Sequence, residues 1–177
     1  MPSRGANLGA GPTEWTFAGL ASLIPNIEPS TTDKKTRIAK PPPDPWDDVD
    51  PNEPPPPCRI LKVSEPEGPL QVLDLQEAQD SVSHVPQVLV FRYRGKIHAI
   101  DHSCPHQSYA LSRGSVYDIE DFGITLSAGI VCPKHGWAFD LHTGQADTGR
   151  YQLGVYEVDI RSGDEGDEVW VRKKSQK

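Results

Sequence analysis

Hydrophobic and polar residues alternate with a period of two through much of the chain after residue 57, and this pattern predicts short β-strands. Apolar side chains recur at every second position because successive residues of a strand point to opposite faces. Gly95 separates two such runs as in a hairpin, and one helical turn is expected at 76–80. Many short strands at close spacing predict an all-β fold, a small antiparallel barrel or sandwich. The predicted strands are 58–63, 70–75, 88–94, 96–100, 129–131, 136–141, 153–160 and 168–171.

Proline separates the first 57 residues from the rest of the chain. Thirteen of the 18 prolines lie in residues 1–57, many of them in the runs 41–45 and 54–57. Such runs lack regular backbone donors and favour an extended, solvated polyproline conformation. We therefore predict a Pro-rich N-terminal tail, mostly disordered, over 1–57 and one domain over 58–177. The apolar piece 15–24 leaves two alternatives: a short helix or strand that docks on the domain or on a partner, or a transiently collapsed patch.

Length and charge exclude several classes of protein. The chain has 177 residues and a formal net charge of −7, which argues against a nucleic-acid partner because those proteins present a basic face. No run approaches the roughly 18 continuous apolar residues of a membrane-spanning helix. The N-terminus has neither a basic start followed by an apolar core nor the Arg-rich, acid-poor composition of a transit peptide. We expect a soluble cytoplasmic protein, with a monomer as the default.

Cysteine is scarce, and two of the three cysteines lie in short boxes that also carry histidine. The boxes are Cys104-Pro105-His106 and Cys132-Pro133-Lys134-His135, and each offers one thiolate and one imidazole. The third, Cys58, is expected as a small buried strand residue, since an odd and low count does not indicate a disulfide framework. A zinc site usually orders its ligands as a Cys pair and then a His pair, whereas here the two types alternate. A [2Fe–2S] cluster with two Cys on one iron and two His on the other requires this donor set.

The two boxes and their flanks resemble the cluster-binding loops of the Rieske [2Fe–2S] family. The similarity includes Gly136-Trp137 after the second box, the run 137–144 and the approach strand 95–101, and it extends over about 58–174. The resemblance implies one [2Fe–2S] cluster per chain, bound in a two-loop subdomain. It implies that Cys104 and Cys132 bind one iron as thiolates, while His106 and His135 bind the outer iron as neutral imidazoles near the surface. His102 is not a ligand position in that family.

The resemblance also implies a function: a ferredoxin-like one-electron carrier that passes electrons from a reductase to an oxygenase or another acceptor. Such a protein is not an enzyme and has no catalytic residues of its own. A catalytic Rieske oxygenase adds a large domain with a second iron held by two His and a carboxylate. After His135 only His142 remains, and too few residues follow to build that domain.

Three departures from the family pattern change what is expected locally. Ser108 stands where many relatives carry glycine, which puts the backbone of the first loop in question. The acidic stretch 117–124 lengthens the segment between the boxes, either as a partner-recognition loop or, the favoured alternative, as a longer surface loop. The boxes lack the extra cysteines of the high-potential members, and Trp137 replaces a serine that bonds a cluster sulfur there. Fewer hydrogen bonds to sulfur predict a potential toward the lower part of the Rieske range.

Three other functions stay open at this point. The chain could be an electron-delivery or regulatory subunit of a larger oxidoreductase, of the nitrite-reductase small-subunit type. It could be a zinc-bound or metal-free interaction module whose Pro-rich tail recruits partners. Nucleophilic catalysis by a boxed cysteine with its histidine ranks last, because two equivalent pairs would be redundant.

Overall fold

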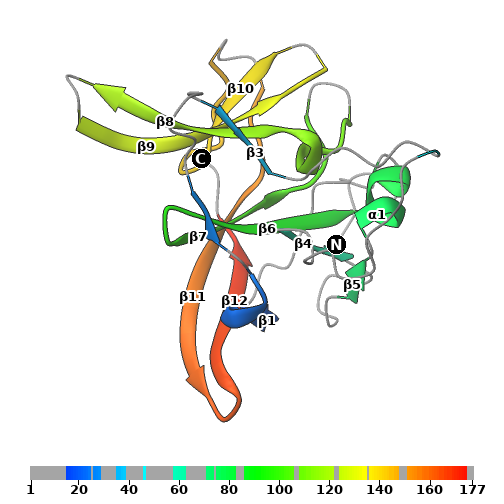
Figure 1. The fold of residues 1–177 in the computed structure, drawn as a ribbon, viewed down its shortest axis with the longest axis vertical. Helices are drawn as coiled ribbons and strands as arrows, with labels where there is room; N and C mark the ends of the chain where they lie inside the picture. The colour runs from blue at the N-terminus through cyan, green and yellow to red at the C-terminus, as the bar shows by residue number, and fades with distance from the viewer. Residues whose placement is uncertain are drawn as a thin grey trace, which may run out of the picture.

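The computed structural model describes residues 15–24, 26–28, 35–38, 46, 58–62, 71–73, 75–82, 86–105, 108–121, 124–134, 136–147 and 151–174. This part of the chain folds into twelve strands, one seven-residue helix and two short 3-10 turns, so the predicted all-β fold class is confirmed. The strands form two sheets (Figure 1). None of the described helices is long and apolar enough to cross a membrane.

The larger sheet carries the approach to the first box. Its path runs β1-β12-β11-β7-β6-β4-β5, with β2 paired beside β6. Neighbours on the path are antiparallel, whereas β2 is parallel to β6. The bounds are β1 Thr16–Leu20, β2 Asn26–Ile27, β4 Cys58–Lys62, β5 Gln71–Leu73, β6 Gln87–Tyr93, β7 Lys96–Asp101, β11 Val155–Gly163 and β12 Gly166–Lys173.

The smaller sheet carries the second box. Its order is β10-β9-β8-β3, all antiparallel, and β9 ends at Cys132. The bounds are β3 Lys35–Arg37, β8 Ser115–Asp121, β9 Ile124–Cys132 and β10 Trp137–Asp140. The described residues of the acidic stretch 117–124, which was expected as a surface loop, instead belong to β8 and β9, whose long hairpin lies at the upper left of Figure 1. Pairing continues up to Asp121↔Ile124, so the described residues of the lengthened segment form backbone hydrogen bonds with one another as a two-stranded ribbon.

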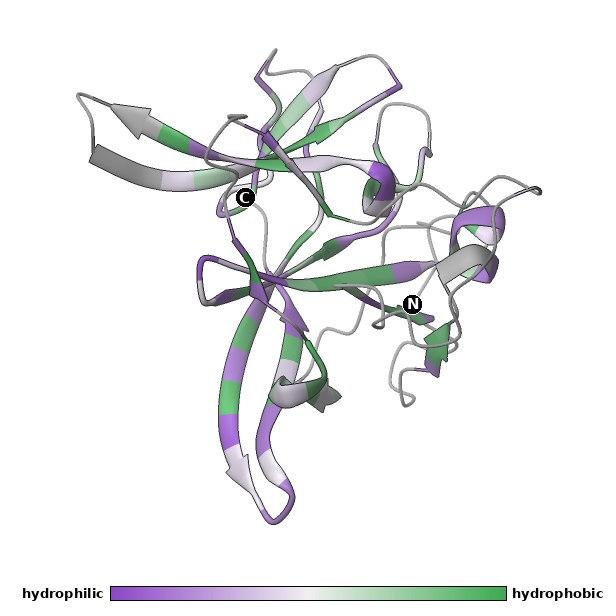
Figure 2. Ribbon diagram, viewed as in Figure 1, coloured by the Kyte–Doolittle hydropathy of each residue, from purple (hydrophilic) through white to green (hydrophobic). Residues whose placement is uncertain are grey.

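Strand β6 shows why the alternating pattern produces two cores. Leu89 and Phe91 point into a first core that also contains Cys104 and Cys132. Val88 and Val90, on the opposite face, join a second core with Val169 and Val171 of β12. A strand buried on both faces places its odd and even residues in different cores. The β11–β12 hairpin, drawn downward in Figure 2, shows alternating hydrophobic and hydrophilic positions along its length.

The apolar N-terminal piece 15–24 docks on the domain. It forms β1, which pairs with β12 from Thr16↔Val171 onward, and the 3-10 turn Ala21–Leu23. Ala18 and Ile24 enter the second core, at 2% and 1% exposure. Two further pieces of 1–57, β2 and β3, pair with β6 and β8. The boundary at residue 58 and the disorder of the tail stay predictions, because the proline runs lie outside the described residues.

Most of the predicted strands after residue 57 end within about three residues of the observed ends. The strand predicted at 129–131 is the C-terminal part of the longer β9, and β8 was missed by the alternating pattern. The helical turn expected at 76–80 is the helix α1, Leu75–Ser81. Cys58 begins β4 and is buried, and burial raises the pKa of its thiol to about 12. Such a thiol behaves as a small apolar side chain.

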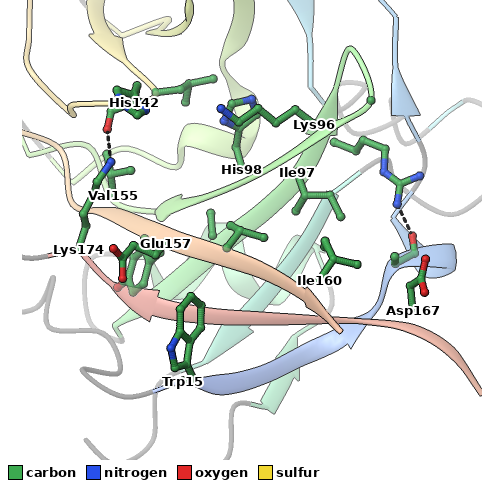
Figure 3. Close-up of a pocket in the computed structure, with 17 residues that line it drawn as sticks. Trp15, Lys96, Ile97, His98, His142, Val155, Glu157, Ile160, Asp167 and Lys174 are labelled. Atoms are coloured by element: carbon green, nitrogen blue, oxygen red, sulfur yellow. Dashed lines mark hydrogen bonds between the residues drawn. The ribbon is translucent and has the colours of Figure 1, made fainter. Parts of the chain in front are cut away.

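A cleft opens where β7 and β11 diverge. Their ladder contains only the pairs Val155↔Ile100 and Tyr156↔Ala99 before the strands separate. The cleft has a volume of about 740 Å³, and His98 and Lys96 line one side while Glu157 and Trp15 line the other (Figure 3). Neither box contributes a described residue to its lining.

Candidate metal centre

The fold brings Cys104 and Cys132 together although 27 residues separate them in sequence. Cys104 follows β7 of the larger sheet, and Cys132 ends β9 of the smaller one. Both side chains are buried, at 1% and 2% exposure, and both belong to the first core. The thiol of Cys132 lies within hydrogen-bond reach of the thiol of Cys104, and neither is part of a disulfide. Two sulfur atoms from separate loops therefore face one another at the junction of the sheets.

The backbone closes both boxes in the same way. Ser108 N–H donates to the Cys104 carbonyl at 2.7 Å, and Gly136 N–H donates to the Cys132 carbonyl at 3.0 Å. Each bond spans four residues, and each donor residue adopts a left-handed backbone, with φ of 53° at Ser108 and 72° at Gly136. Glycine adopts this conformation without a Cβ clash. Ser108 therefore keeps the loop geometry that the sequence put in question, at a local conformational cost.

Replacing Ser108 with glycine is expected to stabilise the protein by about 1 kcal/mol, because it removes the Cβ penalty of the left-handed conformation. This corresponds to a rise in the thermal midpoint of roughly 2–4 °C for a chain of this size. Ser103→Gly is the matched control, because Ser103 has no positive φ and bridges Ala110 in extended geometry. The control should lower the midpoint. Equal shifts for the two variants would contradict the strain at Ser108.

The first loop is held at its base by backbone hydrogen bonds. Cys104 N–H donates to the Tyr109 carbonyl at 2.9 Å, and Leu111 N–H donates to the His102 carbonyl at 2.8 Å. His102 N–H donates to the Gln87 carbonyl of β6 at 3.0 Å. These bonds attach both ends of the loop to the larger sheet, so the position of Cys104 is determined by β6 and β7.

His102 is a buried structural residue rather than a ligand. It is completely buried, and its Nδ1 lies 2.6 Å from Gln87 Oε1 while its Nε2 lies 2.7 Å from Ser112 Oγ. Nδ1–H donates to the amide oxygen of Gln87, so Nε2 accepts from the hydroxyl of Ser112. Gln79 of α1 in turn donates to Ser112 Oγ at 2.9 Å. Both ring nitrogens are engaged by protein groups, which agrees with leaving His102 out of the predicted ligand set.

Little in the sequence predicts this hydrogen-bond network. Gln87 and Ser112 are polar residues that are ordinarily exposed, yet they are 5% and 0% exposed. The one usable signal was Gln87 at the start of an otherwise apolar strand. A buried amide needs a hydrogen-bond partner, and the partner of Gln87 is His102, which follows β7.

The second loop connects β9 to β10, and aromatic residues pack around it. Trp137 pairs with Cys132 in the ladder and packs against the first core. Its ring meets that of Tyr151 edge-on, with centroids 5.0 Å apart. Outside this packed layer, Pro133, Lys134 and Gly136 are exposed, as is Pro105 in the first loop. The cysteines thus lie beneath two loops whose outer side faces solvent.

The two boxed histidines, His106 and His135, lie outside the described residues. Within the described part of the chain, no group of three or more His, Cys, Asp or Glu side chains gathers as metal ligands. The two thiols nevertheless fit one iron of a Rieske cluster. The adjacent Cys104 thiol and burial both raise the pKa of Cys132, so this thiol favours its protonated form without a cation. A bound metal reverses this preference because it stabilises thiolate directly.

Asp101, three residues before Cys104, is a buried carboxyl with an unusual titration. Tyr156 O–H donates to its Oδ1 at 2.7 Å, and Lys173 Nζ lies 3.7 Å from its Oδ2. Burial raises the pKa of Asp101 from 3.8 to about 6, and the attraction of Lys173 opposes that rise. Because the folded pKa exceeds the unfolded one, this group's stabilisation is complete below 3.8 and is lost as pH rises through about 6.

Replacing Asp101 with asparagine is expected to remove this pH dependence. Relative to Asp101→Asn, the wild type should lose up to roughly 3 kcal/mol of stability as the pH rises across that window. The check is the difference in thermal midpoint between the two proteins at several pH values. Asp159→Asn, which removes one carboxylate at an exposed position beside Arg161, is the control for the change in net charge. A flat difference for Asp101→Asn would contradict the raised pKa.

Comparison with known proteins identifies the family. Residues 65–157, more than half of the chain, match the family model of the Rieske [2Fe-2S] domain. The chain belongs to this family. It is 34% identical over 59 residues to the ferredoxin component of an alkene monooxygenase system from Xanthobacter autotrophicus, covering 33% of this chain and 42% of that protein. It is 38% identical over 76 residues to a human Rieske domain-containing protein, covering 43% of each.

A solved structure is similar to part of the chain. The ferredoxin of carbazole 1,9a-dioxygenase from Nocardioides aromaticivorans is 26% identical, with a TM-score of 0.38 over 51% of this chain and 80% of that one. The chain spans about half, or less, of the length of the curated relatives it matches.

Family membership confirms two predictions and removes one alternative. The predicted Rieske resemblance is confirmed, and so is the cofactor, because this family binds a [2Fe–2S] cluster. A zinc-bound or metal-free module is no longer supported. The assignment of the four individual ligands remains a prediction of the sequence.

Proposed function

We propose that this Rieske protein is a one-electron carrier, not an enzyme, and that Cys104, His106, Cys132 and His135 hold its cluster. The observation that carries the proposal is the approach of the Cys104 and Cys132 thiols at the ends of two loops with the same backbone closure. Each thiol stands two or three positions from a histidine of its own box. This arrangement offers the two Cys and two His that a Rieske cluster uses.

When bound, the cluster supplies a redox couple that gains and loses one electron. The chain's own residues provide the surroundings. The first core, with Phe139 and Leu111 fully buried, excludes water from the inner side of the two cysteines. The exposed outer side at Pro105, Pro133 and Gly136 leaves room for another protein to approach. A buried inner side and an accessible outer side suit electron transfer between proteins.

We further propose that a reductase donates the electron and that an oxygenase or another acceptor takes it. The supporting observation is the name of the Xanthobacter relative, a ferredoxin component of a monooxygenase system. A cytoplasmic location and a monomeric state complete the proposal, since a reducing compartment keeps thiolate ligands free. Co-purification with a flavoprotein or sirohaem enzyme would instead favour the subunit of a larger oxidoreductase.

The test is the visible and low-temperature EPR spectrum of protein purified without oxygen, together with assays of iron, sulfide and zinc. We expect a red-brown sample with about two irons and two sulfides per chain, and a Rieske-type EPR signal after reduction with dithionite. A colourless protein with stoichiometric zinc, or with no metal after reconstitution, would overturn the proposal.

The reduction potential is expected toward the lower part of the Rieske range of roughly −150 to +300 mV, below about 0 mV. The residue after Gly136 is Trp137, which packs on Tyr151 and offers no hydroxyl to a cluster sulfur. Fewer donors to sulfur leave the reduced, more negative state less stabilised. A redox titration monitored by visible absorbance measures this value. A potential in the upper half of the range would contradict the argument.

A further inference from the structure

Two basic side chains, one from each cluster loop region, converge on the ring of Tyr109. Lys134 Nζ lies 6.0 Å from the ring centroid, and the guanidinium carbon of Arg113 lies 5.8 Å from it. Lys134 is exposed and stands two residues after Cys132. The carbonyl of Tyr109 accepts the N–H of Cys104. Lys134 therefore lies close to Cys132 in the chain, and both cations lie near Tyr109, which is hydrogen-bonded to Cys104.

Neither of these cations is neutralised by a described carboxylate. The ion pairs among the described residues lie elsewhere: Arg94–Asp118, Arg161–Asp159, Arg172–Glu157 and Lys173–Asp101. Arg113 Nε donates to the neutral amide of Gln79 at 3.2 Å, which orients the guanidinium without cancelling its charge. The positive field of this pair is thus available to solvent at the outer side of the loops.

One group of acidic residues of the described chain lies far from this place. Asp164, Glu165 and Asp167 occupy the tip of the β11–β12 hairpin, at the opposite end of the molecule from β10 in Figure 1. A chain with a net charge of −7 therefore presents its uncompensated positive pair beside the loops.

We propose that Lys134, Arg113 and Tyr109 form a cationic docking patch, and that its occupant is the acidic face of a redox partner protein. The proposal rests on the proposed function, because it places the patch on the exposed outer side of the loops, where electron transfer to another protein was proposed. At physiological salt, charges act over about 8 Å, so the local patch rather than the distant acids governs a partner at contact distance. Complementary charge raises the rate of encounter and orients the partner.

The test uses two small oxidants of opposite charge, so that no partner needs to be known. Ferricyanide is an anion and tris(phenanthroline)cobalt(III) is a cation. Each takes one electron from the dithionite-reduced protein, becoming ferrocyanide or the cobalt(II) complex, with no atom transferred. Stopped-flow rates are measured for the wild type, for Lys134→Glu and for Lys96→Glu. The last variant makes the same change in net charge at the opposite end of β7 from Cys104.

In about 0.1 M salt, where charges act over about 10 Å, Lys134→Glu is expected to slow oxidation by ferricyanide about tenfold and to speed oxidation by the cobalt complex by a similar factor. Lys96→Glu should change both rates less than twofold, and at about 1 M salt all differences should collapse. Arg113→Glu should repeat the effect of Lys134→Glu. If Lys134→Glu loses iron, Lys134→Gln replaces it. This variant removes the positive charge without adding a negative one, so it changes the net charge by half as much. Rates are compared after correction for the measured potential of each variant.

Equal effects of Lys134→Glu and Lys96→Glu in protein that retains its visible spectrum would overturn the patch and leave the carrier function intact. Faster reaction with ferricyanide in Lys134→Glu would point to a basic partner and would also overturn it. A wild type without iron and sulfide would overturn the proposed function itself, and that outcome is seen before any rate is measured.

Discussion

Cys132→Ala is expected to abolish cluster binding, with iron falling from about two per chain to below about 0.2. The thiol of Cys132 is buried and faces that of Cys104, so its removal leaves a single sulfur where an iron needs two. Alanine is preferred to serine because its side chain offers no oxygen that could replace the lost ligand. The measurements are iron and sulfide content and the EPR spectrum of reduced, anaerobically purified protein.

Cys58→Ala is the matched control for this prediction. Cys58 is also a buried cysteine, but it lies in β4 opposite Phe91 and outside both boxes. Removing its sulfur leaves a small cavity and should cost about 1–2 kcal/mol of stability while the iron content stays the same. Loss of iron in both variants would show that the cysteine replacements act through general unfolding, and retention of iron in Cys132→Ala would contradict the ligand assignment.

The same loss is expected when alanine replaces Cys104, His106 or His135. His142→Ala provides the control for the histidines, because His142 lies exposed on a turn after β10. Its replacement should leave iron, sulfide and the EPR signal unchanged. This comparison tests the two histidines that only the sequence assigns. Retention of iron in His106→Ala or His135→Ala would remove that residue from the ligand set.

The second large effect is expected at His102. His102→Phe keeps a ring of similar size but leaves the amide oxygen of Gln87 and the hydroxyl of Ser112 without their partner. An orphaned buried polar group costs about 1–3 kcal/mol, so the variant should lose about 3 kcal/mol. For a chain of this size the thermal midpoint should fall by roughly 6–12 °C. The unfolding is followed by circular dichroism and visible absorbance at one fixed scan rate.

Two further variants distinguish the loss of the His102 hydrogen bonds from the effect of introducing a phenyl ring. His142→Phe makes the same chemical change at an exposed position and should shift the stability by less than about 0.5 kcal/mol. The double variant His102→Phe, Ser112→Ala should lose less than the sum of the two single variants, because one orphaned hydroxyl is removed along with its partner. A midpoint for His102→Phe close to that of the wild type would show that the network does not stabilise the loop.

The expected disruption reaches the metal centre through the backbone. His102 receives the N–H of Leu111 on its carbonyl and donates its own N–H to Gln87, so its displacement frees both ends of the first loop. We therefore expect His102→Phe to lose its visible absorbance at a lower temperature than the wild type, together with the fall in circular dichroism. The histidine is a positioning residue for Cys104.

The pattern along the sequence was sufficient for much of the molecule. Period two identified the strands of the hairpins β6–β7 and β11–β12, because each pairs with its neighbour along the chain through a short turn. The two Cys/His boxes identified the cofactor, because ligand type and order are chemical properties that a short segment carries by itself. Gly136, which follows the second box in the sequence, has a positive φ, a conformation that glycine adopts without a Cβ clash.

Other features depended on partners far away in sequence. The segment 15–24 offered no sign of whether it docks, because its pairing with β12 joins residues as distant as Thr16 and Val171. The stretch 117–124 carries three acidic residues, yet its described residues lie in strands because β8 pairs with β9 on one side and with β3 on the other. The backbone groups of a strand bond to whichever strand lies alongside. Composition alone therefore did not reveal that these two segments form strands.

The sequence by itself determined the chemistry of the centre, and the tertiary structure decided its geometry. Which atoms can bind iron follows from the residue types in two short boxes. Only the fold brings the Cys104 and Cys132 sulfurs into contact, gives Ser108 the backbone of a glycine, and buries His102 between Gln87 and Ser112. The physical reason is that ligand chemistry is a property of single side chains, whereas burial and contact are properties of surfaces contributed by strands distant in sequence.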